Sequence, residues 1–365
     1  MKTRYSVVSA RLWAVLLVAA GFEVAGAPQD PEHLTITRVG VTQGCATLEF
    51  VSPDLSGRHQ LEESSDLRVW RPIPIARFQQ GAGNELCTTL VGLTAETTFF
   101  RIVQVERPAV DPPAYVNLQI DAELDDHQGI RNMIDELVRR GLTATIFVTA
   151  DYANRNAFYI SQVVDRGFEI AMHGFYTGEQ LASMTYEEQR DLLRRALLAL
   201  EGCRPCGTYR PIVGFRPQYF SQNEDTFRVL NELGIVYNSG FKVGDLYLPG
   251  YQWEAMPYRP PGRGFHALPI TTVPVGGKLV YLCDIACANV LQWTPEQWRD
   301  GLMQGLEQTL ETRQPLVLLL HGYFSGDLQT HGYWQPFLDF LDAAQGKVTF
   351  VQSGQLVDLA GANAE

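Results

Sequence analysis

The chain has 365 residues, of which 45% are hydrophobic, so it can bury a full core and divide into two folded units. Its formal net charge is −12, and no run of lysine or arginine interrupts that acidity. A polyanion is therefore a poor partner, and we do not expect nucleic acid binding.

Residues 1–27 have the order of a secretory signal peptide. Basic residues lie within 2–11, an apolar stretch covers 12–20, and small residues occupy 25–27. The apolar stretch is too short to be relied on as a membrane span. Pro28 would hinder cleavage directly before it, so the alternatives are a cut elsewhere or an uncleaved anchor. We expect an exported protein, either secreted or located in the periplasm or cell envelope.

Residues 33–107 alternate apolar and polar side chains in short runs that turn residues separate, and no stretch shows a helical period. This pattern predicts a small antiparallel β-sandwich. Segment 92–102 resembles the late strands of fibronectin type III and immunoglobulin-like modules. Three prolines predict a stiff linker over 108–113, which places a domain boundary there. The runs are 34–38, 46–51, 59–62, 86–90 and 98–103.

Six cysteines, an even number in a chain with an export signal, favour disulfides over metal thiolates. The predicted pairs are Cys45 with Cys87, Cys203 with Cys206, and Cys283 with Cys287. The second pair has a redox dithiol as its alternative, but it follows Gly202 in a loop instead of opening a helix, where a reactive thiolate would be stabilised. Another alternative joins the 203/206 loop to the 283/287 segment.

From residue 114 onward the pattern changes to alternating strands and helices. A capping box at Thr185 to Glu188 and a second cap at Thr294 to Gln297 each predict the start of a helix. About seven βα units over 114–360 predict an α/β fold, a distorted (β/α) barrel. The other expected elements are helices at 131–140 and 225–233, strands at 144–148, 235–237 and 316–320, and a last αβ unit over 334–351.

Four short runs, most of them apolar, end in side chains that can do chemistry. The first leads to Asp121 and Glu123, and the next three lead to His173, Arg216 and His321. The carboxyl ends of the strands of a parallel barrel meet at one face, where active sites are built. We therefore expect these side chains to converge in a metal-assisted hydrolase.

The order of these motifs resembles the polysaccharide deacetylase family, carbohydrate esterase family four, over roughly residues 114–357. Segment 141–148 resembles the buried strand that follows the first motif of that family. The resemblance implies that Asp121 is the catalytic base. It also implies that Glu123 and His173 bind a divalent metal ion, with zinc as the expected metal.

The family places a second metal-binding histidine four residues after the first, and Thr177 occupies that position here. A threonine hydroxyl is a poor ligand for a zinc-like ion, so we expect lower affinity or another side chain in its place. The nearby candidates are Asp125, Asp126, His127 and Glu179.

The segment from Arg216 to Tyr219 resembles the Arg-Pro-Pro-Tyr motif of the family. The resemblance implies that Arg216 orients Asp121 and keeps it ionised, because a nearby guanidinium lowers the pKa of a carboxylate. It implies that the backbone N–H of Tyr219 helps to stabilise the oxyanion. It assigns His321 as the general acid, a role that suits an imidazole. The candidates for the partner that orients His321 are Asp245 and Asp284.

The implied function is removal of acetyl groups from an N-acetylated or O-acylated polysaccharide, with the β-sandwich as a spacer or as a module that holds the enzyme near its polymer. One alternative is a non-catalytic carbohydrate-binding relative that has lost its metal site. The other is a hydrolase of a different amide or ester on the same barrel, since a fold does not fix a substrate.

Overall fold

A computed structural model describes the chain as two compact units. The units are Met1–Asp111 with Gly276–Lys278, and Pro112–Val275 with Leu279–Glu365. Among the described residues, no helix is both long enough and apolar enough to cross a bilayer. The described residues are 16–17, 24–25, 35–42, 45–52, 58–64, 68–73, 78–80, 85–91, 99–105, 113–123, 127–202 and 211–362.

The first unit contains two antiparallel sheets, and each predicted strand is present. One sheet has the order β1 (Leu16–Leu17), β9 (Phe99–Val105), β5 (Arg58–Ser64) and β6 (Arg71–Pro72), and the other has the order β2 (Val24–Ala25), β3 (Thr35–Thr42), β4 (Cys45–Val51), β8 (Glu85–Val91) and β7 (Phe78–Gln80). The ring of Phe50 in β4 lies 5.6 Å from that of His59 in β5, so the sheets pack face to face. The likeness to fibronectin modules and the signal peptide stay predictions.

Two of the three predicted disulfides are not supported. Cys45 lies opposite Val91 and Cys87 opposite Glu49, an offset that separates the two cysteine Cα atoms by roughly 13 Å, beyond the span of a disulfide. Cys283 and Cys287 are both free and buried. They stand one helical turn apart, where Cβ atoms lie about 5–6 Å from each other, too far for the bridge. Cys203 and Cys206 lie outside the described residues.

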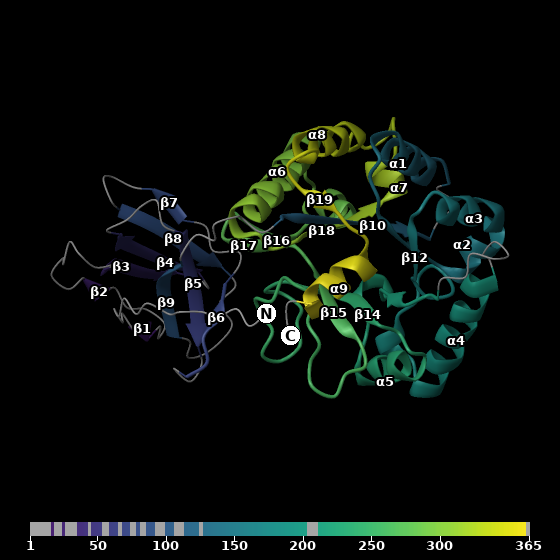
Figure 1. The fold of residues 1–365 in the computed structure, drawn as a ribbon, viewed down its shortest axis with the longest axis horizontal. Helices are drawn as coiled ribbons and strands as arrows, with labels where there is room; N and C mark the ends of the chain where they lie inside the picture. Colours follow the sequence, from purple (N-terminus) through teal and green to yellow (C-terminus); the bar gives the residue numbers. More distant parts are fainter. Residues whose placement is uncertain are drawn as a thin grey trace. The chain divides into compact units, whose positions relative to one another are not determined.

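The second unit is built on one parallel sheet that almost closes on itself, which confirms the predicted distorted barrel (Figure 1). Its order is β15 (His266–Ile270), β14 (Tyr237–Lys242), β13 (Gly214–Phe215), β12 (Glu169–Met172), β11 (Thr145–Val148), β10 (Tyr115–Ala122) and β18 (Leu316–His321), and β19 (Thr349–Phe350) also pairs with β10. The N–H of Thr271 bonds to Val317 across the remaining gap, and Cys283 forms a bridge with Leu319. A hairpin of β16 (Thr272–Val275) and β17 (Lys278–Tyr281) follows β15.

Helices surround this sheet and begin where the sequence predicts caps (Figure 1). The Thr294 side chain accepts a bond from the N–H of Gln297 at the start of α6. The predicted strand at 235–237 begins later than expected, because the N–H of Ile235 still bonds to Leu230 in the preceding helix. The helices are α1 (His127–Arg140), α2 (Ala150–Arg155), α3 (Ala157–Asp165), η1 (Leu181–Ser183), α4 (Tyr186–Gly202), η2 (Gln218–Phe220), α5 (Glu224–Glu232), η3 (Ala286–Val290), α6 (Pro295–Thr312), α7 (Gly322–Ser325), α8 (Trp334–Ala344) and α9 (Ser353–Ala362).

Strand alternation divides the core into an outer and an inner layer. Leu318 and Leu320 of β18 pack outward with the helices, whereas Val317 and Leu319 belong to the cluster inside the barrel. Helix α9 contributes Leu356 to that inner cluster and closes one end of the barrel. The opposite end, where the strands finish, is left for polar side chains.

Candidate active site

The same alternation carries the predicted site residues to the inside of the barrel. Along β10, Leu118 and Ile120 face the outer core, so Gln119 and Asp121 face inward. Residue His321 continues the inward parity of β18 and lies opposite Asp121 in the register. All of them stand at the carboxyl end of the sheet, where the sequence places them.

Asp121 lies between a guanidinium and two imidazoles. Its Oδ1 accepts a hydrogen bond from Nη2 of Arg216, and its Oδ2 lies 3.3 Å from Nε2 of His173 and 3.6 Å from Nε2 of His321. Burial raises the pKa of Asp121, but the charge and hydrogen bond of Arg216, together with the nearby His173 and His321, lower it more, so this pKa lies below its ordinary value. The carboxylate is therefore ionised and ready to accept a proton.

Arg216 is fully buried and held on three sides. Besides Asp121, its guanidinium bonds to the amide oxygen of Gln119, and it stacks 3.9 Å from the ring centroid of Phe147. The amide nitrogen of Gln119 donates to Asn117, which fixes its own orientation. The two acceptors and the ring face together fix the orientation of the planar guanidinium.

His173 offers a free lone pair toward two carboxylates. Its Nδ1 donates to the backbone carbonyl of Arg216 over 2.9 Å, which leaves Nε2 without a proton in the neutral ring. That Nε2 lies 3.3 Å from Oδ2 of Asp121 and 3.8 Å from Oε2 of Glu123. A carbonyl that fixes the tautomer is the usual support of a metal-binding histidine.

His321 pairs with Asp284, one of the two partners proposed from the sequence. Its Nδ1 donates to Oδ1 of Asp284 over 2.7 Å, and the hydroxyl of Ser325 donates to Oδ2 of the same carboxylate. Burial lowers the pKa of His321, but the charge and hydrogen bond of Asp284, helped by the other carboxylates, outweigh it. The pKa of His321 therefore lies above its ordinary value, as a proton donor requires. The other candidate, Asp245, pairs with Lys242 instead.

The bridge between Cys283 and Leu319 explains the position of Asp284. It sets the short segment before Asp284 parallel to β18, so the carboxylate arrives beside His321. The sequence carries a signal for this, because an apolar run at 279–283 ends in an aspartate just as the first motif does.

Thr177 does not stand in for the missing histidine. Its hydroxyl donates to the backbone carbonyl of Glu123. Tyr323 donates its hydroxyl to Oε1 of Glu123 over 3.3 Å. Both side chains therefore act on Glu123, one on its backbone and one on its carboxylate.

The other proposed substitutes have different roles or lie outside the described residues. The Glu179 carboxylate accepts bonds from the N–H groups of Phe175 and Tyr176 and shapes their loop. Both ring nitrogens of His127 are engaged, one by the hydroxyl of Tyr152 and one by a guanidinium of α1. Asp125 and Asp126 are not among the described residues.

Tyr219 lies in a strained turn directly after Arg216. It has a φ of 53°, and its side chain is 65% exposed. The turn therefore fixes the backbone of Tyr219 and leaves its side chain in solvent. Gln218 anchors the turn, because its amide donates to the carbonyl of His173 over 2.9 Å. The turn is therefore tied to the strand that carries the metal-binding candidate.

The residues present fit a divalent cation. An ion about 2.1 Å from each ligand keeps tetrahedrally placed ligand atoms roughly 3.4 Å apart. The distance from Nε2 of His173 to Oε2 of Glu123, 3.8 Å, is close to that spacing. An imidazole and a carboxylate are ligands that zinc accepts.

A second group, Cys283, Asp284 and His321, brings its ligand atoms within 4.8 Å of one another. It suits an ion less well. Each oxygen of Asp284 already accepts two hydrogen bonds, from the backbone and ring of His321, from Ile285 and from Ser325. Burial also raises the pKa of the Cys283 thiol well above its ordinary value, which disfavours the thiolate that binds metal.

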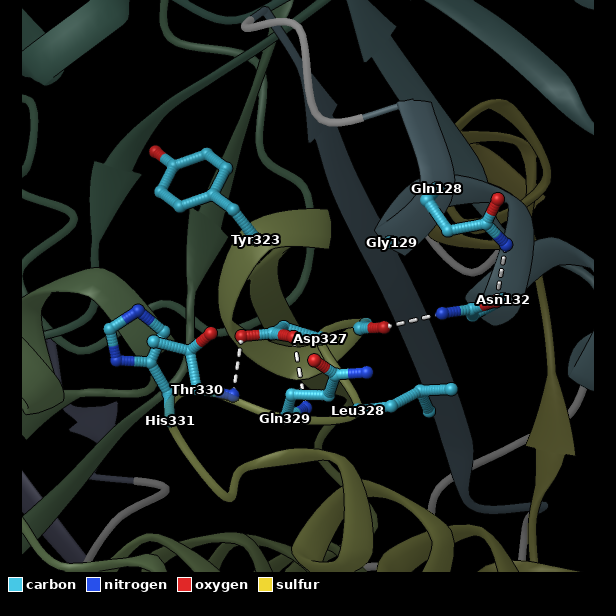
Figure 2. Close-up of a pocket in the computed structure, with 10 residues that line it drawn as sticks. Gln128, Gly129, Asn132, Tyr323, Asp327, Leu328, Gln329, Thr330 and His331 are labelled. Atoms are coloured by element: carbon cyan, nitrogen blue, oxygen red, sulfur yellow. Dashed lines mark hydrogen bonds between the residues drawn. The ribbon is translucent and has the colours of Figure 1, made fainter.

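A pocket of about 430 Å³ adjoins the site at Tyr323 (Figure 2). Asn132 of α1 lines it and donates to the carbonyl of Gly326, and Asp327 accepts bonds from the backbone of its own loop. Most of the lining side chains are polar, although apolar atoms make up the larger part of the pocket surface. The remaining lining residues are Gln128, Gly129, Leu328, Gln329, Thr330 and His331.

A family model described as polysaccharide deacetylase matches residues 111–238. The match includes Asp121, Glu123, His173 and Arg216, and His321 lies beyond it. A comparison with curated proteins found no match.

Several solved structures share the fold. A protein assigned to the polysaccharide deacetylases from Mycobacterium smegmatis is 19% identical, with 71% of this chain and 94% of that chain covered and a TM-score of 0.53. A similar assignment from Pseudomonas aeruginosa PAO1 is 18% identical, with 68% and 94% covered and a TM-score of 0.54. Puue allantoinase is 15% identical, with 71% and 98% covered and a TM-score of 0.55. These similarities show the barrel fold.

Proposed function

We propose that this protein is a metal-dependent hydrolase that removes acetyl groups from an acylated polysaccharide. The observation that carries the proposal is the setting of Asp121, which contacts Arg216 on one side and lies within 3.6 Å of both His173 and His321 on the other. The match of residues 111–238 to the polysaccharide deacetylase model supports the substrate class.

In the proposed reaction each residue of the site has its own role. Glu123 and His173 would hold a zinc-like ion, which supplies a Lewis acid for the carbonyl and lowers the pKa of a bound water. Asp121, kept ionised by Arg216, accepts the proton of the attacking water. The Tyr219 N–H is proposed to bond to the oxyanion that develops.

His321 completes the cycle as the general acid. Its raised pKa favours the protonated ring, and Asp284 holds it through Nδ1, so Nε2 is the atom that delivers the proton. That proton goes to the leaving sugar nitrogen, or to the sugar oxygen if the substrate is an ester. The products are acetate and a free amino or hydroxy sugar.

Export and the role of the first unit belong to the same proposal. Residues 1–27 would direct the chain out of the cytoplasm, and the β-sandwich unit would hold the enzyme near its polymer or act as a spacer. Zinc is the proposed metal because an imidazole and a carboxylate are the proposed ligands.

The test is acetate release from N-acetylated chitooligosaccharides and from acetylated xylooligosaccharides, with zinc and after chelation. We expect release by the wild type that chelation abolishes, and a loss of about 10²–10⁴-fold for Asp121→Asn. Asp245→Asn, a carboxylate that pairs with Lys242 away from His321, is the matched control.

Two outcomes would overturn the proposal. If the zinc-loaded wild type releases no acetate but binds the glycans, the protein is a carbohydrate-binding relative. If it releases acyl groups from small non-sugar amides alone, the barrel serves another substrate. The structural likeness to Puue allantoinase makes cyclic amides a useful arm of that comparison.

A further inference from the structure

We propose that Thr177 and Tyr323 are positioning residues that fix Glu123 as a metal ligand in place of a second histidine. The inference rests on the proposed function, because it assumes a divalent cation beside His173. It assigns a use to the one position where the sequence departs from the two-histidine pattern.

Glu123 needs support that the sheet does not give. Strand β10 ends at Ala122, and the carbonyl of Ala122 accepts the N–H of Thr149 as one of the last main-chain bonds of this edge. Glu123 follows that end. A ligand on such a segment has to be held by other contacts if it is to bind metal tightly.

Thr177 supplies the main-chain contact. Its hydroxyl donates to the Glu123 carbonyl, across a sequence separation of 54 residues. The loop that carries Thr177 is itself fixed, because Glu179 accepts the N–H of Tyr176 over 2.7 Å and Gln218 accepts the N–H of Gly178 over 2.6 Å. The hydroxyl therefore presents a preformed donor to the Glu123 backbone.

Tyr323 supplies the side-chain contact, and it gives the two carboxylate oxygens of Glu123 different roles. Its hydroxyl donates to Oε1 of Glu123 over 3.3 Å, whereas Oε2 of the same group lies 3.8 Å from Nε2 of His173. One oxygen is held by the phenol, and the other faces the metal-binding nitrogen. Tyr323 directly follows Gly322 after β18, so the strand that carries His321 also places this donor.

The experiment measures zinc affinity by calorimetry on chelator-stripped, dialysed full-length protein, and zinc content per chain by mass spectrometry. Thr177→Val and Tyr323→Phe should each weaken zinc binding by about 10–100-fold, the usual effect of removing a partner that orients a ligand. Thr177→Ser should bind zinc with wild-type affinity because serine keeps the hydroxyl. The metal-free melting temperature should not change in any of these variants.

Matched controls come from the same chain. Tyr176→Phe removes a phenol from a half-exposed side chain, and Thr349→Val removes a hydroxyl at the opposite end of the barrel, where β19 pairs with the start of β10. Both should bind zinc as the wild type does. Cys283→Ala should also leave affinity unchanged, and a loss there would place the ion at the Cys283 group and overturn the inference.

The remaining outcomes separate this inference from the proposed function. If Glu123→Gln loses zinc while Thr177→Val and Tyr323→Phe keep wild-type affinity, the positioning inference is wrong and the proposed hydrolase stands. If the wild type binds no zinc and releases no acyl group, both are wrong.

Discussion

His173 donates its Nδ1 hydrogen to the backbone carbonyl of Arg216, so one 2.9 Å bond joins two motifs that lie 43 residues apart in the sequence. Because that bond occupies Nδ1, the lone pair on Nε2 faces the carboxylates of Asp121 and Glu123. The strand end that positions the guanidinium therefore also sets the direction of the metal-binding imidazole.

Replacing Arg216 with lysine should not preserve activity. A lysine ammonium cannot bond to both Asp121 and Gln119 while stacking on Phe147. We expect Arg216→Lys to lower kcat/KM by about 10²-fold and to move the acidic limb of its pH profile upward, because Asp121 loses the fork that lowers its pKa. Arg228→Lys, an exposed change, is the control. An unmoved acidic limb would show that Arg216 does not set this pKa.

Asp284→Asn should move the basic limb of the same profile. The carboxylate raises the pKa of His321, and a general acid is active only below its pKa. Without that charge the His321 pKa falls, so activity should disappear at a lower pH than in the wild type while the acidic limb stays in place. Steady-state kcat/KM across the pH range measures both limbs. A basic limb that does not move would assign it to another group.

Gln119→Leu should reduce stability. The change leaves Nη1 of the buried Arg216 guanidinium without an acceptor and removes one of the two acceptors of the Ser239 hydroxyl, at a cost of about 1–3 kcal/mol in the free energy of unfolding. Urea unfolding measures the loss. Gln329→Leu, on the exposed loop of the pocket, should change stability by less than about 0.5 kcal/mol. Equal effects in the two variants would contradict the buried network.

Glu169 gives a prediction for stability as a function of pH. Burial raises its folded-state pKa, although its carboxylate accepts bonds from Tyr237, Thr145 and Gly354. A group with a raised folded pKa contributes stability that is present below the unfolded pKa, about 4.3, and lost as the pH rises through the folded pKa.

Glutamine at this position does not titrate, so wild type should lose stability relative to Glu169→Gln between about pH 4 and pH 8. Chemical unfolding of both proteins at the two pH values measures the difference. A constant difference would mean that the carboxyl has an ordinary pKa in the folded protein.

Strand periodicity predicts most of the site, because it fixes both the face and the end of each strand. Asp121, His173, Arg216 and His321 follow that rule, and the structure brings them together. The barrel follows from the same alternation of strands and helices, with a boundary error where Ile235 still caps a helix.

The contacts that complete the site depend on pairings between distant segments. The apolar run before Asp284 marks this aspartate as a candidate, but the single bridge that brings it to His321 leaves no pattern in the sequence. Thr177 and Tyr323 meet at Glu123 from separate loops, and no local pattern marks such a meeting. The cysteine pairs are predicted from proximity in the sequence. A strand register or a helical turn can still hold such cysteines too far apart to form a disulfide.

Ser353 opens the last helix, and its hydroxyl accepts a bond from the amide of Gln119, the group that also receives Arg216. Ser353, Gln119 and Arg216 thus form a chain of hydrogen bonds inside the barrel. It runs from the end that α9 closes to Asp121 at the carboxyl end of the strands. Proteolytic cleavage just before this helix, if it displaces Ser353 from Gln119, should therefore lower activity although no reacting group is altered.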